Sequence, residues 1–313
     1  MSPNTMTTIY TGLDIAKPNL QLHLAGRAYD LPNTRIGHRR LVKLLNQRGG
    51  VHVVCEATGG YERDVVAALH AASVPVSVLN PARARFFAKA TGQCAKTDRI
   101  DAALLTAYGQ ALQPKPTPAR TALEQQLTEL VRRRQQLVEI IVAQRQQAEQ
   151  LTLPVLRRQA QSLLRRFERD RDQLEDQLRD LRQQMAPLDQ RLQKLEAIQG
   201  VGTLTALSVL AEMPELGTLT RRQAAALAGL APFTRESGRW QGMRAIGGGR
   251  AGVRRALYMA ALVAARTNQV LSPFYQKLRA AGKPAKVALT AVMRKLIVLM
   301  NHVLKNPDFV LQN

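Results

Sequence analysis

The apolar positions of the first 115 residues follow two different periods. Short apolar runs predict strands at 8–15, 20–25, 51–55 and 74–79, and apolar positions three and four apart predict helices at 38–47, 61–70 and 98–109. Strands that alternate with helices are typical of an α/β domain. A proline-rich segment follows at 113–118, and closely spaced prolines favour extended backbone over helix. We therefore expect an α/β domain over residues 1–115.

The next segment carries a narrow apolar stripe. Positions 123, 127, 130, 134, 137, 141, 144, 148 and 151 repeat with 4-3 spacing, and a second series runs from Phe167 to Leu195 after the break at Pro154. Pro187 is expected to kink this second helix. Such a stripe needs a partner helix, from the same chain or from a second copy. Residues 116–197 are thus predicted to form a helical hairpin or coiled coil.

The remaining residues, 198–313, predict a third and mostly α-helical domain. It opens with Gly200-Val201-Gly202 and an apolar helix. Backbone N–H groups exposed at such a helix start can hold a DNA phosphate without reading bases, although this short glycine pattern is weakly specific.

Charge limits the choice of partner. The chain has 45 Lys and Arg against 23 Asp and Glu, a formal net charge of +22, which favours binding to a polyanion. Nucleic acid is the expected partner. No membrane partner is expected, because the apolar stretch 287–304 is interrupted by Arg294 and Lys295. Without a visible secretory signal or zinc-ligand spacing, the protein is expected to be cytoplasmic and free of zinc.

Four carboxylates fall where strands end or a helix begins. Asp14 ends the first predicted strand, Glu56 follows the strand 51–55, and Asp98 and Asp101 share one side of a helix start. If they converge, they repel one another unless divalent cations neutralise them, and Mg²⁺ suits such oxygen ligands. Helix capping is the structural alternative for Asp98 and Asp101. Arg83, Arg85 and Lys96 add nearby cations that either follow a phosphate chain or form a solvated basic face.

A second candidate site lies in a glycine-flanked loop. Ser237 stands between Arg235 and Arg239 in the segment 234–242, and a serine held there could attack a phosphodiester. An ordinary polar turn is the alternative. The basic segment Gly247-Gly248-Gly249-Arg250 follows, and then a helix that bears Arg254.

Several motifs together resemble a known family. Gly12-Leu13-Asp14-Ile15-Ala16-Lys17, Glu56-Ala57-Thr58-Gly59-Gly60-Tyr61 and Lys96-Thr97-Asp98-Arg99-Ile100-Asp101-Ala102 resemble the DEDD motifs of insertion-sequence transposases of the IS-one-ten family. Gly229-Leu230-Ala231-Pro232, followed by Ser237-Gly238 and Gly242, resembles the C-terminal motif of that family. The order and spacing agree over nearly the whole chain. The glycine run 247–249 differs from the more polar sequence common in relatives, which bears on local nucleic-acid contacts and not on the catalytic positions.

The resemblance implies a fold and a reaction. The fold is an RNase H-type, RuvC-like N-terminal domain, a coiled coil, and a C-terminal transposase domain with a nucleophilic serine. In the implied reaction Asp14, Glu56, Asp98 and Asp101 hold Mg²⁺ and Ser237 forms a covalent phosphoserine–DNA intermediate.

The implied partners are double-stranded donor and target DNA, a structured guide RNA called the bridge RNA, and further copies of the chain, as a dimer that assembles into a tetramer. The expected nucleic-acid contacts are Arg83, Arg85, Lys96, Arg99, Arg235, Arg239, Arg250 and Arg254.

Three other functions fit parts of the sequence. A metal-dependent DNA junction nuclease needs only the four carboxylates and water, and it forms no covalent adduct. An actin-like sugar kinase also has a strand that ends in Asp and a later Gly-Gly turn, but the charge of +22 argues against it. A nucleic-acid chaperone predicts no strand cleavage with any metal.

Overall fold

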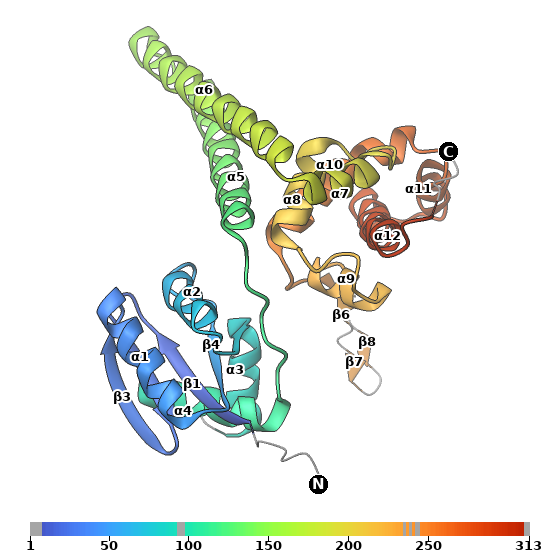
Figure 1. Cartoon of the computed structure of the whole chain (residues 1–313). Helices are drawn as coiled ribbons and strands as arrows, with labels where there is room; N and C mark the ends of the chain where they lie inside the picture. The colour runs from blue at the N-terminus through green and yellow to red at the C-terminus, as the bar shows by residue number, and fades with distance from the viewer. Residues whose placement is uncertain (1–7, 93–97, 234–235, 238–239, 242–244, 310–313) are drawn as a thin grey trace. The chain divides into compact units, whose positions relative to one another are not determined.

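The computed structural model describes residues 8–92, 98–233, 236–237, 240–241 and 245–309 of the 313-residue chain. The side chains of residues 98–99, 236–237 and 240–241 are not described. The chain folds into two compact units, Met1–Arg120 and Thr121–Asn313 (Figure 1). Their boundary lies close to the end of the proline-rich segment.

The first unit is built on a five-stranded mixed sheet. Its strands are β1 (Ile9–Ile15), β2 (Asn19–Leu24), β3 (Arg27–Pro32), β4 (Val51–Glu56) and β5 (Val76–Leu79), in the order β3-β2-β1-β4-β5. β1 pairs with β2 antiparallel and with β4 parallel, and β5 extends the parallel part. The four predicted strands are confirmed. β3 was not predicted, because it is an edge strand in which Leu31 alone is buried and no apolar pattern marks it.

Helices cover both faces of this sheet, as expected of an α/β domain. α1 (Arg35–Arg48) and α2 (Arg63–Ala71) bury Leu41 and Leu69 with Leu13 in one core cluster. α3 (Pro81–Ala90) and α4 (Asp98–Leu112) form a second cluster on Val54, which points to the other face. Successive residues of β4 therefore point into different core clusters on the two faces of the sheet. Because both faces are buried, the sequence of β4 is a nearly continuous apolar run.

α4 lies unusually close to β1, and two glycines permit this approach. A Cβ atom on Gly12 would lie 1.9 Å from the carbonyl oxygen of Ala102, and one on Gly109 would lie 2.8 Å from the ring of Tyr10. The backbone N–H of Gly12 donates to Thr106 Oγ1 at 2.8 Å. These close contacts fix where α4 starts relative to β1.

The proline-rich segment is extended, as predicted, and runs along the outer edge of β5. Thr117 exchanges hydrogen bonds with this strand: its N–H donates to Val76 O at 2.8 Å, and its hydroxyl accepts from Val78 N at 2.9 Å. Ser77 Oγ donates to Lys115 O at 2.7 Å. The segment is therefore fastened to the first unit, and the chain leaves that unit only after it.

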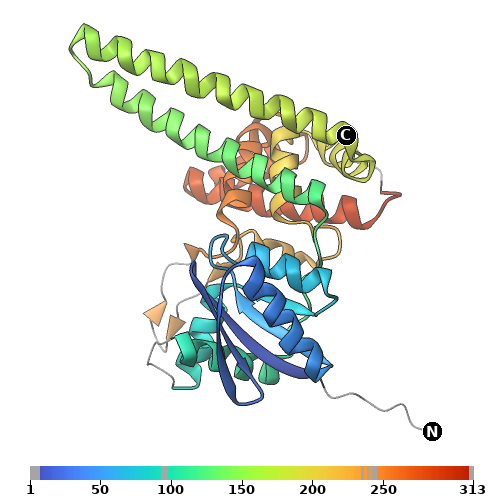
Figure 2. The ribbon, with the colours of Figure 1, turned by 60° about the vertical axis from the view of Figure 1, so that its left-hand side comes forward.

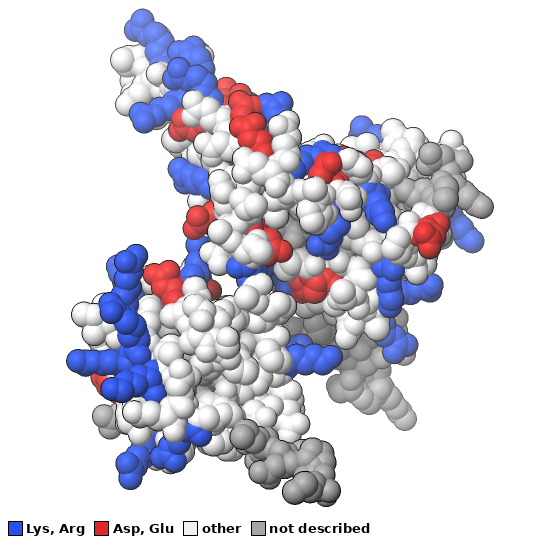
Figure 3. All heavy atoms as spheres, in the orientation of Figure 1, with Lys and Arg blue, Asp and Glu red and all other residues white. Residues whose placement is uncertain are grey.

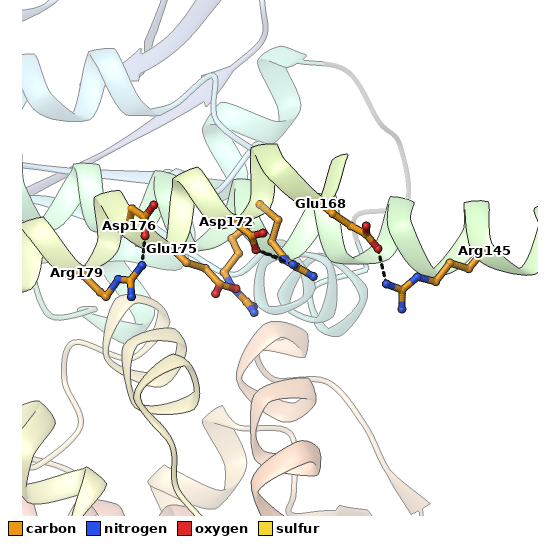
Figure 4. A network of polar contacts seen from close by, with 8 residues as sticks. Arg145, Glu168, Asp172, Glu175, Asp176 and Arg179 are labelled. Carbon is orange, nitrogen blue, oxygen red and sulfur yellow. Dashed lines mark hydrogen bonds and ion pairs between the residues drawn. The ribbon is translucent and has the colours of Figure 1, made fainter. Parts of the chain in front are cut away.

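The second unit begins with the predicted helical hairpin. α5 (Ala122–Glu149) starts at a capping box of Thr121 and Glu124, and α6 (Pro154–Gln184) returns beside it (Figures 1 and 2). Ion pairs Arg134–Glu175 at 2.7 Å and Arg145–Glu168 at 2.5 Å join the two helices (Figure 4).

The base of the hairpin is part of a larger core. The chain bends at Met185 into α7 (Ala186–Glu196), with Pro187 in its first turn, as expected. Leu178 and Leu181 are buried in the same core cluster as Leu127 of α5. In this half of the stripe, the partner helix therefore comes from the same chain.

α9 (Arg221–Leu227), α10 (Ala251–Thr267) and α11 (Leu271–Ala280) pack against α12 (Ala285–Lys305), and α8 (Thr203–Glu212) packs against α10. An 18-residue window of α12 has a mean hydropathy of 1.6, which by length and composition could cross a membrane, but 50% of it is buried inside the protein. Asn301 of α12 accepts from Gly217 N and donates to Leu219 O. These contacts are those of a core helix.

Candidate active site

Asp14 and Glu56 lie next to each other at the carboxyl end of the parallel strands. Leu13 of β1 is paired with Cys55 of β4, so the following residue on each strand is a carboxylate at the same level. Neighbouring strands are about 4.8 Å apart, which places the two acids within reach of one small ligand. Both residues are partly exposed. The strand pairing therefore brings together the first two predicted site residues.

Both acids lie on the side of the sheet that α4 covers. Asp14 is two residues after Gly12, which faces α4, and Glu56 is two residues after Val54, which belongs to the cluster with Leu105 of α4. Because side chains alternate along a strand, residues two apart share a face. Asp14 and Glu56 thus point to the same layer.

α4 runs antiparallel to β1 and begins at this edge. Gly109 is opposite Tyr10 and Ala102 is opposite Gly12, so the turn before Ala102 reaches the level of Asp14. Asp101, in the first turn of α4, is partly exposed. Asp98 is the first residue of α4, and its side chain lies outside the described residues. Among the described residues, no group of three or more His, Cys, Asp and Glu could hold a metal ion.

The turn after Glu56 is closed by a glutamate that the sequence did not single out. Glu62 Oε2 accepts from Thr58 N at 3.1 Å, from Thr58 Oγ1 at 2.8 Å and from Gly60 N at 2.8 Å. Burial opposes ionisation of Glu62, but these hydrogen bonds outweigh it, so the pKa of its carboxyl lies below its usual value. These two turn N–H groups are therefore occupied within the protein.

Of the four cations predicted near this edge, the structure describes the side chains of two. Arg83 and Arg85 are exposed on α3, which begins directly after β5, and Leu79 of β5 is paired with Glu56. Lys96 and Arg99 lie at positions whose side chains are not described. The structure therefore places α3 and its arginines at the edge that carries the carboxylates.

α1 carries a basic surface that the sequence reasoning missed. Arg35, Arg39 and Lys43 are exposed, and Lys and Arg gather over the α1–β3 side of the first unit (Figure 3). The signal was a cation at every fourth position in a helix without any Asp or Glu. Because α1 packs on the sheet face opposite to α4, this surface is separate from the carboxylates.

Ser237 belongs to a segment between α9 and α10 that forms two short pairs of antiparallel strands, called the ribbon below. β6 (Pro232–Phe233) pairs with β9 (Ala245–Ile246), and further out β7 (Glu236–Ser237) pairs with β8 (Trp240–Gln241). Ser237 is opposite Trp240 in this pairing, and the side chains of both are outside the described part of the chain, as are Arg235 and Arg239. Ser237 therefore lies in a pair of short antiparallel strands, and its role as a nucleophile stays a prediction.

The base of the ribbon is held by glycines and arginines. A Cβ atom on Gly249 would lie 2.2 Å from the backbone N of Gly229, and both residues have positive φ. Arg250 forms an ion pair with Glu215 at 2.6 Å, and Arg254 Nη1 donates to Gly248 O at 2.7 Å. These two arginines, predicted to contact nucleic acid, hold the ribbon to the second unit through these bonds. The close contact with Gly229 explains the glycine at 249, whereas a Cβ atom on Gly247 or Gly248 would meet nothing within 4 Å.

Comparison with known proteins covers most of this chain. Residues 12–156 match a DEDD transposase family model, and residues 192–276 match the family described as Transposase IS116/IS110/IS902. The pilin gene-inverting protein of Moraxella bovis is 27% identical over 312 residues, which cover 96% of this chain and 97% of that protein. The pilin gene-inverting protein of Moraxella lacunata matches to the same extent. The two family matches together span most of the chain, which belongs to the IS110 family of insertion-sequence transposases and is a DNA recombinase.

Proposed function

We propose that the protein recombines DNA through a covalent phosphoserine–DNA intermediate, in which Ser237 is the nucleophile. The observation that carries this proposal is that Asp14 and Glu56 each follow the paired residues Leu13 and Cys55 on neighbouring parallel strands, at the edge where α4 begins with Asp101 in its first turn. With Asp98, these acids form the ligand set for Mg²⁺. The mixed sheet covered by helices on both faces supports an RNase H-type, RuvC-like catalytic domain.

The chemistry of the ligand set fits Mg²⁺. All four side chains are carboxylates, which Mg²⁺ binds together with phosphate oxygens. When bound, the metal neutralises charge on the phosphate and on the attacking and leaving oxygens. Asp14 and Glu56 supply ligands from the rigid sheet, and Asp101 supplies one from α4, which the glycine contact holds against β1.

The reaction is two successive transfers of one phosphoryl group. Ser237 Oγ attacks the phosphorus and loses its proton, and the bond from phosphorus to the leaving sugar oxygen breaks as that oxygen gains a proton. Strand exchange reverses the step, because a sugar hydroxyl of the incoming strand attacks phosphorus and Ser237 leaves. A serine hydroxyl is a weak nucleophile at its ordinary pKa. Arg235 and Arg239 assist the attack by stabilising the negative charge of the pentacoordinate phosphorus state.

The partners of this reaction are also proposed. Donor and target DNA duplexes, a structured guide RNA and further copies of the chain assemble in the cytoplasm, and the charge of +22 supports binding of polyanions. Residues 116–197 and 198–313 act as separate functional modules, of which residues 116–120 lie in the first unit and the rest in the second. The named relatives invert a pilin gene, which is one outcome of DNA recombination. Sequencing the nucleic acid that copurifies with the protein tests the guide, and activity unaffected by ribonuclease excludes it.

The serine is tested by looking for the covalent adduct. End-labelled donor DNA is incubated with protein, Mg²⁺ and the copurifying RNA, and a denaturing gel shows whether label moves with the polypeptide. We expect Ser237→Ala to abolish the adduct and recombination, Ser237→Cys to retain a trace, and Ser162→Ala, at an exposed serine of α6, to match the wild type. An undiminished adduct in Ser237→Ala excludes this serine. Strand cleavage without an adduct in the wild type favours the hydrolytic junction nuclease.

A further inference from the structure

Phe86 of α3 is the most exposed large apolar side chain of the described residues, at 71% of its full accessible area. Its neighbour Phe87 packs against Tyr108 with the ring centroids 5.2 Å apart, so α3 already has an aromatic residue for its own core. Burial of a Phe side chain stabilises a folded protein, and Phe86 forgoes most of this contribution. The ring is therefore available to a ligand.

Cations stand on both sides of this ring. Arg83 and Lys89 lie three residues before and after Phe86, so all three side chains share the outer surface of α3, roughly 4.5 Å apart along the helix axis. The sequence of α3, PARARFFAKA, contains no acidic residue. Within the described part of the chain, neither Arg83 nor Lys89 has an acidic partner at ion-pair distance. An exposed aromatic ring between such cations matches the alternation of bases and phosphates in a nucleic-acid strand.

α3 also has the right position for this role. Asn80 precedes α3, and its side chain caps the helix by accepting from Ala82 N at 2.9 Å. The residue before it, Leu79, ends β5 and is paired with Glu56. A strand whose phosphate lies at the carboxylates thus has the first turns of α3 beside it.

We propose that Phe86 stacks on an unpaired base of the DNA strand at the carboxylate edge, while Arg83 and Lys89 contact the flanking phosphates. This deepens the proposed function and rests on it, because strand exchange exposes unpaired bases next to the cleaved phosphate. Phe has no hydrogen-bonding group, so the contact accepts any base. A second protein copy is a poorer occupant, since covering the ring would also remove two unpaired cations from water.

The test compares single-stranded and duplex DNA. A fluorescein-labelled oligodeoxynucleotide is titrated with the full-length protein in the Ser237→Ala background, which separates binding from chemistry, and anisotropy gives Kd. We expect Phe86→Ala and Phe86→Leu to weaken single-strand binding about tenfold and Phe86→Tyr to retain it, because only the last keeps a ring. The affinity for duplex DNA of the same sequence should not change. A 2-aminopurine base in the oligonucleotide should lose fluorescence with the wild-type residue and with Phe86→Tyr only.

The salt dependence of binding tests the proposed phosphate contacts of Arg83 and Lys89. Arg83→Gln and Lys89→Gln should each lower the slope of log K against log salt for single strands by about 0.7, whereas Phe86→Ala should leave this slope unchanged. Arg158→Gln, at an exposed cation of α6, is the charge-matched control and should leave single-strand binding unaltered.

Four outcomes overturn the proposal. Full binding by Phe86→Leu means that apolar contact suffices, and equal losses for single-stranded and duplex DNA mean that no unpaired base is involved. A stronger fluorescence loss with the matching RNA oligonucleotide assigns the ring to RNA. A change of mass by light scattering in Phe86→Ala without DNA assigns it to a protein interface. Since none of these readouts needs the covalent adduct, failure of the serine mechanism is recognised separately.

Discussion

At the scale of single residues, Gly12 controls the distance between the two elements that carry the carboxylates. The space for its side chain is filled by the carbonyl oxygen of Ala102, and its N–H is bonded to Thr106 of the same helix. Asp14 and Asp101 lie on the two sides of this contact. The glycine thus links backbone packing to the geometry of the proposed metal ligands.

Replacement of Gly12 should therefore affect both stability and chemistry. Gly12→Ala forces α4 away from β1, and we expect a loss of about 2 kcal/mol in the stability of the first unit, as for other overpacked sites. Hydrogen exchange of the α4 amides measures this loss, and adduct yield at a temperature where the variant is folded should also fall. Gly247→Ala is the control, because a Cβ atom there meets nothing within 4 Å. Wild-type protection of α4 in Gly12→Ala would contradict this account.

At the scale of elements, a buried histidine joins β4, β5 and the proline-rich segment. His52 of β4 lies 2.9 Å from Ser77 Oγ through Nε2, and that hydroxyl donates in turn to Lys115 O. The ring of His52 also lies against that of Tyr10, with centroids 5.1 Å apart. Burial lowers the pKa of His52 from its ordinary value of 6.5, because the charged ring would lose hydration.

This environment predicts how stability depends on pH. The pKa of His52 is lower in the folded than in the unfolded chain. Its contribution to stability is therefore complete above about pH 6.5 and is lost as the pH falls through the pKa of the folded chain. We expect the melting temperature of the first unit to drop between pH 7.5 and 5.5, and less steeply in His52→Gln. Burial also lowers the pKa of His38, although the charge of Asp64 opposes this shift. His38 therefore accounts for part of the pH dependence that remains in His52→Gln. His302→Gln, in the second unit, is the control, and an unaltered slope in His52→Gln would refute the assignment.

The helical hairpin shows the limit of periodicity at the same scale. The 4-3 stripe predicted α5 and α6 but left open which chain supplies the partner helix. Because Leu178 and Leu181 are buried with Leu127, charged substitutions there disrupt the core of the second unit. A loss of oligomers in such variants would therefore not locate an assembly surface.

At the scale of the whole molecule, the positive charge proposed for nucleic-acid binding and the carboxylates proposed for catalysis have different distributions. The net charge of +22 is spread over the chain, whereas the carboxylates occupy one edge of one sheet. Removal of one acid changes the overall charge little. It removes a proposed metal ligand completely.

Asp14→Ala and Glu56→Ala should thus abolish cleavage while DNA affinity stays the same or rises slightly. Asp180→Ala, an exposed acid of α6, changes the charge equally and should keep full activity. A gel-shift titration and the adduct assay, each run with Mg²⁺ and with EDTA, measure both properties. Full activity in EDTA would disprove the metal dependence.

The sequence by itself determined most of the element types, although not β3 or α3, together with the helical hairpin, the basic character and the motifs of the family. Apolar periodicity and proline placement are local properties, so they can be read without coordinates. Tertiary structure decided what depends on contacts distant in sequence. Strand pairing set Glu56 beside Asp14, and the close approach at Gly12 set the start of α4. Helix packing left Phe86 exposed and partly covered Phe87. These outcomes follow from which surfaces meet in space, and a one-dimensional pattern does not contain that information.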